Sequence, residues 1–351
     1  MLSFEQIVLE VTEACPNACL HCYNYWRDDR APVRSSGTLT RNEIRAIIRS
    51  IKADSRLKHV GISGGEPLLR RDLPGIASDL IDEGLGVLVI TSGASLTEAV
   101  LSRFPRETAF EMTLFSSDAA LHDRVAGRTG AFARLVKAAL LVTGRGHPLA
   151  ISVVANRLNA QRTGDALRLG LALGGNAFLF NRMNLTRAML PHAGELAPTA
   201  EQLSVALDQA EEFARECRTT VSVSVPIPPC VVDLTRYRHL FFGWCARGGV
   251  DSYYTVGYNG LLRPCNHSSQ ILGDLRTHSF RELVRSRRTR SFWRPVPSEC
   301  KQCELPDAHL CRGGCPAAAD ECYGTRLRRD PVVDVILRPA AVPVARKGPP
   351  S

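Results

Sequence analysis

The fold is decided by the stretch Cys15-Pro16-Asn17-Ala18-Cys19-Leu20-His21-Cys22-Tyr23. It follows an apolar run at residues 7–11, which has the length of a buried strand. Three thiolates within eight residues, on a loop at the end of a strand, can converge on one face of an iron–sulfur cluster. A zinc site that uses His21 and a set of buried free cysteines are the alternatives. The spacing favours the cluster, because structural zinc sites usually carry paired cysteines two residues apart.

Short apolar runs alternate with longer amphipathic segments from residue 6 to about residue 225. This alternation is typical of repeated strand–helix units around a parallel sheet. Thr40 and Glu43 form a capping-box pattern before one apolar helix face. The expected strands are residues 7–11, 60–63, 87–90, 110–115, 150–155 and 177–180. The sequence therefore predicts an α/β domain of six units over residues 1–225.

The pattern changes after residue 225. Pro226, Pro228 and Pro229 interrupt regular structure, and cysteines become dense. We expect a small cysteine-rich α+β domain over residues 226–330. Prolines accumulate again after Asp330 without an amphipathic period, so residues 331–351 are expected to form a disordered tail.

Composition excludes several classes of protein. A chain of 351 residues with 12 cysteines is too poor in cysteine for a disulfide scaffold. No apolar run reaches the ~18 to 20 residues that span a bilayer, and no secretory signal opens the sequence, so we expect a cytoplasmic enzyme with no membrane partner. The net charge of +9 comes from scattered residues that are mostly arginine, which indicates a GC-rich genome rather than a nucleic-acid site.

The cysteine spacing and the aromatic Tyr23 resemble the signature of radical S-adenosylmethionine (SAM) enzymes. A second element supports the resemblance, because Gly64-Gly65-Glu66-Pro67 directly follows the second expected strand and matches the glycine-glycine-glutamate-proline element of that family. The resemblance implies a partial (β/α)6 barrel with a SAM-binding [4Fe-4S] cluster at its C-terminal mouth. It also implies reductive cleavage of SAM to a 5'-deoxyadenosyl radical that abstracts a hydrogen atom from the substrate.

The same resemblance implies a set of SAM-binding positions. Glu66 offers a carboxylate to an amino group, and Arg124 or Arg128 can pair with the methionine carboxylate. The positions carried over as cofactor-binding are Gly64, Gly65, Glu66, Pro67, Ser116, Asn156 and Arg128.

The downstream cysteines resemble the SPASM extension, which houses two auxiliary [4Fe-4S] clusters; a pair of structural zinc sites is the alternative. By position, one cluster takes Cys245, Cys265 and Cys315, and the other takes Cys300, Cys303, Cys311 and Cys322. With Cys15, Cys19 and Cys22, the resemblance implies three [4Fe-4S] clusters.

Two further residues are candidates for chemistry. Cys230 is a candidate fourth ligand of the first auxiliary cluster; a hydrogen-donating thiol and a buried structural cysteine are its alternatives, and Asp251 or an open iron would replace it as the fourth ligand. His267 is a candidate base or a hydrogen-bond donor to sulfur. In some members of the family an aspartate at the position of Asn266 acts as the catalytic base. Asparagine cannot take this role, which disfavours a sulfatase-maturing activity.

These features predict a tailoring enzyme of antibiotic-type natural-product biosynthesis that acts on a sugar, aminocyclitol or nucleoside. Dehydrogenation, epimerisation and decarboxylation are the reactions considered. The reason is that the first strand begins at residue 6, without the leader-binding module that many peptide-modifying relatives carry. The alternatives are a maturase that crosslinks or epimerises a ribosomally made peptide with the help of a separate leader-binding protein, and a non-enzymatic Fe-S or zinc interaction protein. A flavodoxin or ferredoxin is the expected electron donor.

Overall fold

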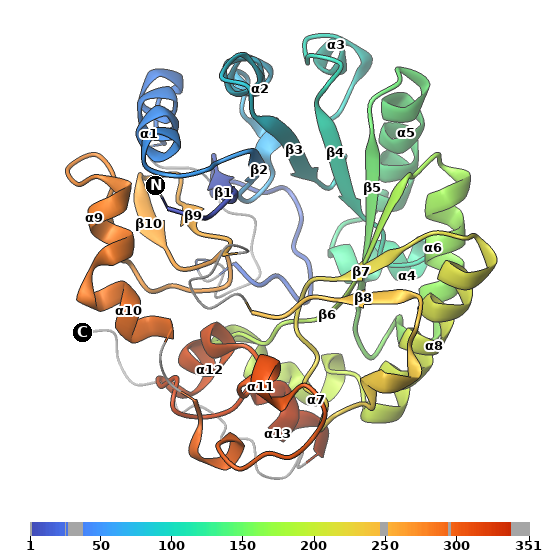
Figure 1. Ribbon diagram of the computed structural model, residues 1–351. Helices are drawn as coiled ribbons and strands as arrows, with labels where there is room; N and C mark the ends of the chain where they lie inside the picture. The colour runs from blue at the N-terminus through green and yellow to red at the C-terminus, as the bar shows by residue number, and fades with distance from the viewer. Residues whose placement is uncertain (1, 25, 27–37, 246–251, 294–295, 338–351) are drawn as a thin grey trace.

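The computed structural model describes residues 2–24, 26, 38–245, 252–293 and 296–337. Within these residues eleven strands form one curved sheet, in the order β11-β10-β9-β1-β2-β3-β4-β5-β6-β7-β8 (Figure 1). Strands β1 to β8 are parallel, β9 is parallel to β1, and β9, β10 and β11 pair antiparallel. The strands are β1 Gln6–Glu10, β2 His59–Ser63, β3 Gly86–Thr91, β4 Ala109–Thr113, β5 Leu149–Ala155, β6 Ala177–Arg182, β7 Val221–Val223, β8 Leu240–Phe242, β9 Thr255–Val256, β10 Leu261–Arg263 and β11 Gly273–Asp274.

Helices cover the outer face of this sheet, and the last ones lie along one side of the barrel (Figure 1). The α-helices are α1 Arg41–Asp54, α2 Leu73–Asp82, α3 Glu98–Leu101, α4 Ala119–Ala126, α5 Ala131–Gly144, α6 Thr163–Ala172, α7 Ala193–Leu196, α8 Ala200–Glu216, α9 Phe280–Arg285, α10 Arg287–Trp293, α11 Ala308–Cys311, α12 Pro316–Tyr323 and α13 Pro331–Leu337. Short 3-10 turns are η1 Pro67–Leu69, η2 Ala160–Arg162, η3 Arg187–His192, η4 Leu234–Arg236 and η5 Ser298–Cys300.

Strand alternation places polar side chains inside the barrel. On β4, Phe110 and Met112 are buried in the core beneath the helices, whereas Glu111 and Thr113 alternate to the opposite face. The capping box predicted at Thr40 is confirmed, since its side chain accepts from the Glu43 amide and the Glu43 carboxylate accepts from the Thr40 amide. All six predicted strands are present.

The sheet is longer than the predicted six strands. Strands β7 and β8 extend it on one edge, and β9 joins β1 on the other. The boundary expected at residue 226 therefore falls between two strands of one sheet, because a short parallel strand needs only three paired residues and shows no clear sequence period. Residues 331–337 form α13 with Val332 and Val333 buried, so the expected disordered tail is wrong for this segment; residues 338–351 lie outside the described residues.

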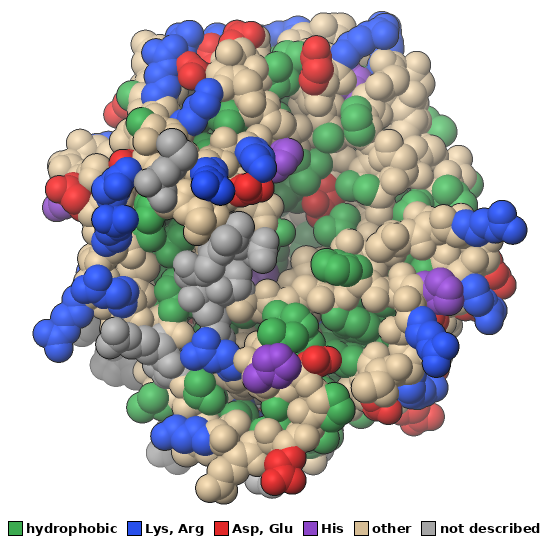
Figure 2. Space-filling model, viewed as in Figure 1, with side chains coloured by type: hydrophobic (Ala, Val, Ile, Leu, Met, Phe, Trp, Pro, Cys, Tyr) green, Lys and Arg blue, Asp and Glu red, His purple; other side chains and the backbone are tan. Residues whose placement is uncertain are grey.

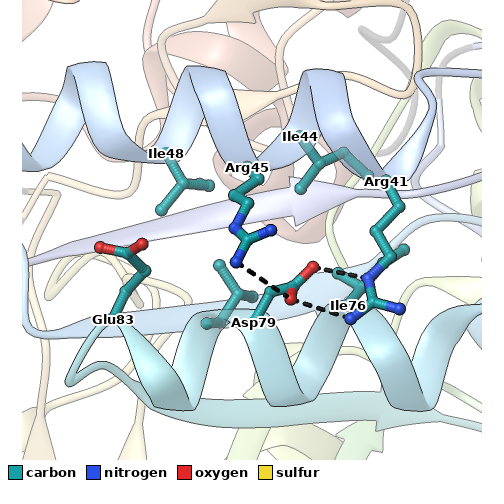
Figure 3. Close-up of a pocket in the computed structure, with 8 residues that line it drawn as sticks. Arg41, Ile44, Arg45, Ile48, Ile76, Asp79 and Glu83 are labelled. Carbon is teal, nitrogen blue, oxygen red and sulfur yellow. Dashed lines mark hydrogen bonds and ion pairs between the residues drawn. The ribbon is translucent and has the colours of Figure 1, made fainter.

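Helices α1 and α2 pack together through an ion pair. Arg41 Nε lies 2.6 Å from Asp79 Oδ2, and Arg45 Nη2 lies 3.9 Å from Asp79 Oδ1, in a cleft lined by Ile44 and Ile76 (Figure 3). This cleft belongs to the outer helical layer and none of its lining residues is a cysteine. Its ion pairs connect α1 to α2, and we assign this cleft a structural role.

The surface agrees with the composition. On the face shown in Figure 2, Lys and Arg side chains are spread around the periphery. No helix in the described part of the chain has both the length and the apolar character needed to cross a membrane.

Two buried arginine–carboxylate pairs join the barrel to the cysteine-rich segment. Arg263 at the end of β10 pairs with Glu10 at the end of β1, and both side chains are almost fully buried. Arg182 at the end of β6 pairs with Asp330 in the same way. Each pair connects a strand of the first unit to a residue more than 140 positions later.

Replacing Arg182 with alanine should destabilise the protein strongly, because it leaves the Asp330 carboxylate buried and unpaired. The expected loss is about 3–5 kcal/mol of unfolding free energy. Urea denaturation of the reconstituted protein measures it. Arg168→Ala is the matched control: Arg168 pairs with Glu216 at the surface, where an ion pair contributes at most about 1 kcal/mol. Equal losses for the two variants would contradict the structural role given to Arg182.

Candidate active site and cluster sites

The first cysteine loop is clamped by backbone contacts from two sides. On one side, Gly65 N donates to Thr12 O at 2.8 Å and Glu66 N donates to Ala14 O at 2.7 Å. A Cβ atom on Gly65 would overlap the carbonyl oxygens of Glu13 and Ala14. The glycines therefore serve close backbone packing against the cysteine loop, a role that sequence reasoning assigned only to ligand contact.

On the other side, the loop lies against the end of α4. Ala18 N donates to Ala126 O at 3.2 Å and Leu20 N donates to Val125 O at 2.9 Å. Gly127 has a φ of 61°, and a Cβ there would overlap Ala18 O. The Cys15, Cys19 and Cys22 thiols remain half-buried, as a loop that presents them to a cofactor requires.

Glu66 is a positioning residue in this structure. Its buried carboxylate accepts hydrogen bonds from Thr91 Oγ1 at 2.5 Å, from Ser92 N at 2.9 Å and from Ser92 Oγ. Pro67 follows it as the first residue of η1. These contacts tie the Gly64–Pro67 element to the end of β3; binding of an amino group by Glu66 stays a prediction.

Of the other predicted SAM positions, Ser116 and Asn156 follow the carboxyl ends of β4 and β5, and Arg128 follows helix α4. Asn156, after β5, is fully buried, and its Nδ2 has no hydrogen-bond partner in the described part of the chain. Ser116 is also fully buried and accepts from Asp118 N at 3.0 Å. Arg128 reaches the cysteine loop at Asn17, whereas Arg124 is exposed. The unpaired Asn156 amide fits a ligand with acceptor atoms such as SAM.

The cysteines of one predicted auxiliary set lie close together in the structure. Cys245, Cys265 and Cys315 lie within electrostatic range of one another and pack against Phe292 and Trp293. Burial raises the pKa of Cys315 to about 12, and burial also raises the pKa of Cys265 above its usual range. Binding of iron to these thiols would release their protons. Asp251 lies outside the described residues.

The second set differs from the prediction in one member. Cys300, Cys303 and Cys311 line one cavity, and Cys230 lines the same cavity. Cys322 is not among the described residues that line it. Instead Cys322 is buried in the main hydrophobic core on α12. The structure therefore places Cys230 with the second set rather than beside Cys245 and Cys265.

His267 and Asn266 connect the auxiliary site to the first cysteine loop. Asn266 Nδ2 donates to the Tyr23 hydroxyl at 3.2 Å, and the His267 ring lies 4.6 Å from the Tyr23 ring in an edge-to-face contact. Burial, with smaller effects from Arg182 and Arg263, lowers the pKa of His267 to about 4. The imidazole is neutral at pH 7, which leaves it a weak base; its candidate role as a base stays a prediction.

In the described part of the chain, no three His, Cys, Asp or Glu side chains converge tightly enough for a single metal ion. A zinc site needs such convergence on one ion. A [4Fe-4S] cluster has cysteine ligands on separate irons, so its thiolates surround a volume rather than a point. The cavity that Cys230, Cys300, Cys303 and Cys311 line is the candidate place for such a cluster.

Two residues that sequence reasoning missed are Asn24 and Glu111. Asn24 Nδ2 donates to Gly64 O at 3.1 Å and so joins the cysteine loop to the glycine element. Glu111 faces the barrel interior, and burial raises its pKa to about 7. The signal for Glu111 was present, since a charged residue between Phe110 and Met112 interrupts an otherwise apolar strand.

Family models match most of this architecture. The radical SAM superfamily model matches residues 9–169, and the SPASM iron-sulfur cluster-binding domain model matches residues 245–304. The chain is a radical SAM enzyme with a SPASM domain. The predicted fold class is thereby confirmed, and so are its cofactors, SAM and more than one [4Fe-4S] cluster.

Curated relatives of this radical SAM chain are named PqqA peptide cyclase. The one from Methylocella silvestris is 28% identical over 337 residues, which covers 93% of this chain and 86% of the relative. The one from Granulibacter bethesdensis is 25% identical with the same coverage. Among solved structures, Streptococcus suis SuiB bound to S-adenosylmethionine shares the fold with a TM-score of 0.73 and 15% identity, over 94% of this chain and 77% of SuiB.

These comparisons correct the functional prediction. The expected small polar substrate and the antibiotic-type context are wrong as the main interpretation, because relatives that align over nearly the whole chain are named as peptide cyclases. The prediction depended on the position of the first strand, which does not distinguish enzymes that act on small molecules from enzymes that act on peptides. The peptide alternative has the better support.

Replacing Gly65 with alanine should displace the first cysteine loop, because the new Cβ overlaps backbone oxygens that cannot move alone. Iron in the anaerobically reconstituted protein should fall by roughly four atoms per chain, and SAM cleavage should be lost. Gly144→Ala is the control: no atom lies within 4 Å of its new Cβ, so iron and SAM cleavage should be unchanged. Full iron and full cleavage in the Gly65 variant would contradict the backbone clamp.

Proposed function

We propose that this enzyme is a peptide maturase that forms an oxidative crosslink between two side chains of a ribosomally made peptide. The observation that carries the proposal is the alignment with PqqA peptide cyclases over 93% of the chain. A crosslink requires the peptide to lose two hydrogen atoms: one leaves as an atom, and the other leaves as a proton and an electron. When bound, SAM and the clusters supply hydrogen-atom abstraction and electron transfer. The chain itself must hold the peptide and accept the proton.

The enzyme must first hold the peptide near both the SAM site and the auxiliary site. Contacts between Tyr23 and the loop after Cys265 bring these two sites together. The Asn266–Tyr23 hydrogen bond and the His267–Tyr23 ring contact hold the auxiliary loop against the first cysteine loop. Burial raises the pKa of Tyr23 to about 12, so its hydroxyl keeps its proton and the bridge stays neutral. A substrate bound beside this contact would be in reach of both cofactor sites.

Glu111 is the proposed proton acceptor. It lies on β4, faces the barrel interior and is near enough to Tyr23 to influence the tyrosine electrostatically. The other acidic group near Tyr23, Glu10, is paired with Arg263 and is unavailable. Glu111 has no hydrogen-bond or ion-pair partner among the described residues, and a pKa of about 7 suits a general base at neutral pH.

A reducing cytoplasm and a flavodoxin or ferredoxin donor complete the proposal. The 12 thiols are free of disulfides in the structure, which accords with a reducing compartment. Since clusters must be reduced before SAM is cleaved, a small low-potential electron carrier is the partner class that fits.

The substrate class is tested by incubating reconstituted enzyme, SAM and dithionite with two peptides. These are a short peptide encoded beside the gene for this chain and the PqqA peptide of Methylocella silvestris. We expect one of them to lose the mass of two hydrogen atoms and to resist fragmentation between the joined residues. SAM cleavage with both peptides unchanged, or inversion of a residue without mass loss, would contradict the proposal.

Glu111→Gln should lower crosslink formation by roughly 10²- to 10⁴-fold, because the amide cannot accept a proton. In the parent enzyme the rate should rise with pH through about 7 and then level off, since only the deprotonated carboxylate is a base. The variant should lose this rise while still cleaving SAM. Glu107→Gln, at an exposed position just before β4, is the control and should keep the parent profile. An unchanged profile in the Glu111 variant would exclude it as the base.

A further inference from the structure

We infer that Cys230 is the fourth protein ligand of the auxiliary cluster held by Cys300, Cys303 and Cys311, and that Cys322 is not a cluster ligand. The inference goes beyond the proposed function, because it concerns cofactor ligation and does not depend on the substrate. Its basis is a single cavity that four cysteines line.

Three separate segments build this cavity. Residues 228–230 form one wall, residues 299–313 supply Cys300, Cys303 and Cys311, and Arg329 and Val333 close it. Cys300 ends η5 and Cys311 ends α11. Four thiols from two distant segments around one cavity are a complete ligand set for a [4Fe-4S] cluster.

The backbone aims Cys230 at this cavity. Val231 N donates to Pro228 O at 2.9 Å, which closes a turn with Pro229 and Cys230 at its two central positions. Proline at the first central position fixes that part of the turn before ligand binding. Val231 and Val232, which follow, are buried in the core and anchor the turn. The thiol is thus held in place by rigid backbone rather than by its own packing.

Cys322 has a different environment. It lies seven residues after Cys315 along α12, which displaces it by roughly 10 Å along the helix axis. Its side chain is 8% exposed and belongs to the main hydrophobic core. Ala318 and Ala319 share the buried side of the same helix. Cys322 therefore behaves as a small apolar residue of the core.

Charge in the cavity suits a cluster with four thiolates. Arg329 lines the cavity, and Asp334 fixes its guanidinium through contacts of 3.0 and 2.6 Å. A cluster bound by four thiolates is negatively charged overall, and a guanidinium at its edge offsets part of that charge. Gly313, with a φ of 91°, brings its backbone within reach of Cys300, since a Cβ there would lie 3.5 Å from the sulfur.

Iron content tests the inference in a Cys15→Ala, Cys19→Ala, Cys22→Ala background, which keeps only the auxiliary sites. Reconstituted background protein should bind about eight irons per chain. Adding Cys230→Ala should reduce this to about four, or alter the electron paramagnetic resonance spectrum of the reduced clusters if iron is retained. Adding Cys322→Ala should leave both iron and spectrum unchanged. Cys217→Ala, on the half-buried helix-end cysteine, is a further control.

The opposite pattern, with iron lost in the Cys322 variant and iron and spectrum unchanged in the Cys230 variant, would overturn the inference. Loss of iron in both variants would also overturn it.

Alkylation with iodoacetamide gives a second readout on the unmutated chain. Cys230 is exposed, so a free thiol there should be alkylated at alkaline pH, where the thiolate forms, whereas ligation to iron should protect it. Mass spectrometry of the holoprotein should show Cys230 unmodified, and removal of iron with a chelator should make it reactive. Rapid modification of Cys230 in protein with full iron content would overturn the inference, even if the alanine variants prove unstable.

Discussion

The arrangement of the whole molecule depends on two buried arginines that reach from one half of the chain to the other. Arg263 Nη1 donates to Ser268 O at 2.8 Å while its other end pairs with Glu10, so one guanidinium holds both the end of β1 and the loop after Cys265. Arg182 Nε donates to Pro226 O at 2.8 Å and pairs with Asp330, which in turn accepts from Cys315 N at 2.9 Å. Buried pairs of this kind add little net stability compared with apolar packing, but their geometry is specific. Their effect is to fix where the cysteines of the second unit stand relative to the barrel.

The two arginine pairs also determine where the predicted cofactor sites lie relative to each other. The first cysteine loop begins directly after β1, the strand that carries Glu10, and the Cys265 loop begins directly after β10, the strand that carries Arg263. One ion pair therefore helps to fix the first cysteine loop relative to the loop that carries Cys265. Tyr23 completes the connection from the opposite direction through Asn266. Neither the glycine clamp nor this bridge involves a thiol, so the scaffold constrains the cysteines while leaving their sulfur atoms available to iron.

Local patterns explain how much of this could be predicted. The strand at residues 7–11, the capping box at Thr40 and the cysteine loop are each encoded within a dozen residues, and the sequence indicated all three. The backbone clamp of Gly65 was only partly predictable, because a glycine signals close approach without saying to what. The Arg182–Asp330 pair spans 148 positions, and one sequence carries no signal that pairs an arginine with a distant aspartate among 44 basic and 35 acidic residues. The prediction of the substrate class was wrong for a related reason, since substrate choice depends on the shape of a site assembled from many segments.

The auxiliary cysteines show most clearly what sequence spacing cannot predict. Spacing along the chain orders thiols by sequence, and by that order Cys322 continues the series that begins at Cys300. Their positions in the fold differ from this order. Helix α12 begins after Cys315 and places Cys322 in the core. A turn that contains Pro229, more than 60 residues before Cys300, places Cys230 at the cavity wall. Because a helix adds about 1.5 Å per residue, cysteines placed on it at a spacing of seven separate rather than converge. Sequence order therefore predicts which cysteines lie together where they share a loop, as Cys15, Cys19 and Cys22 do, whereas the fold is needed wherever a regular element lies between them.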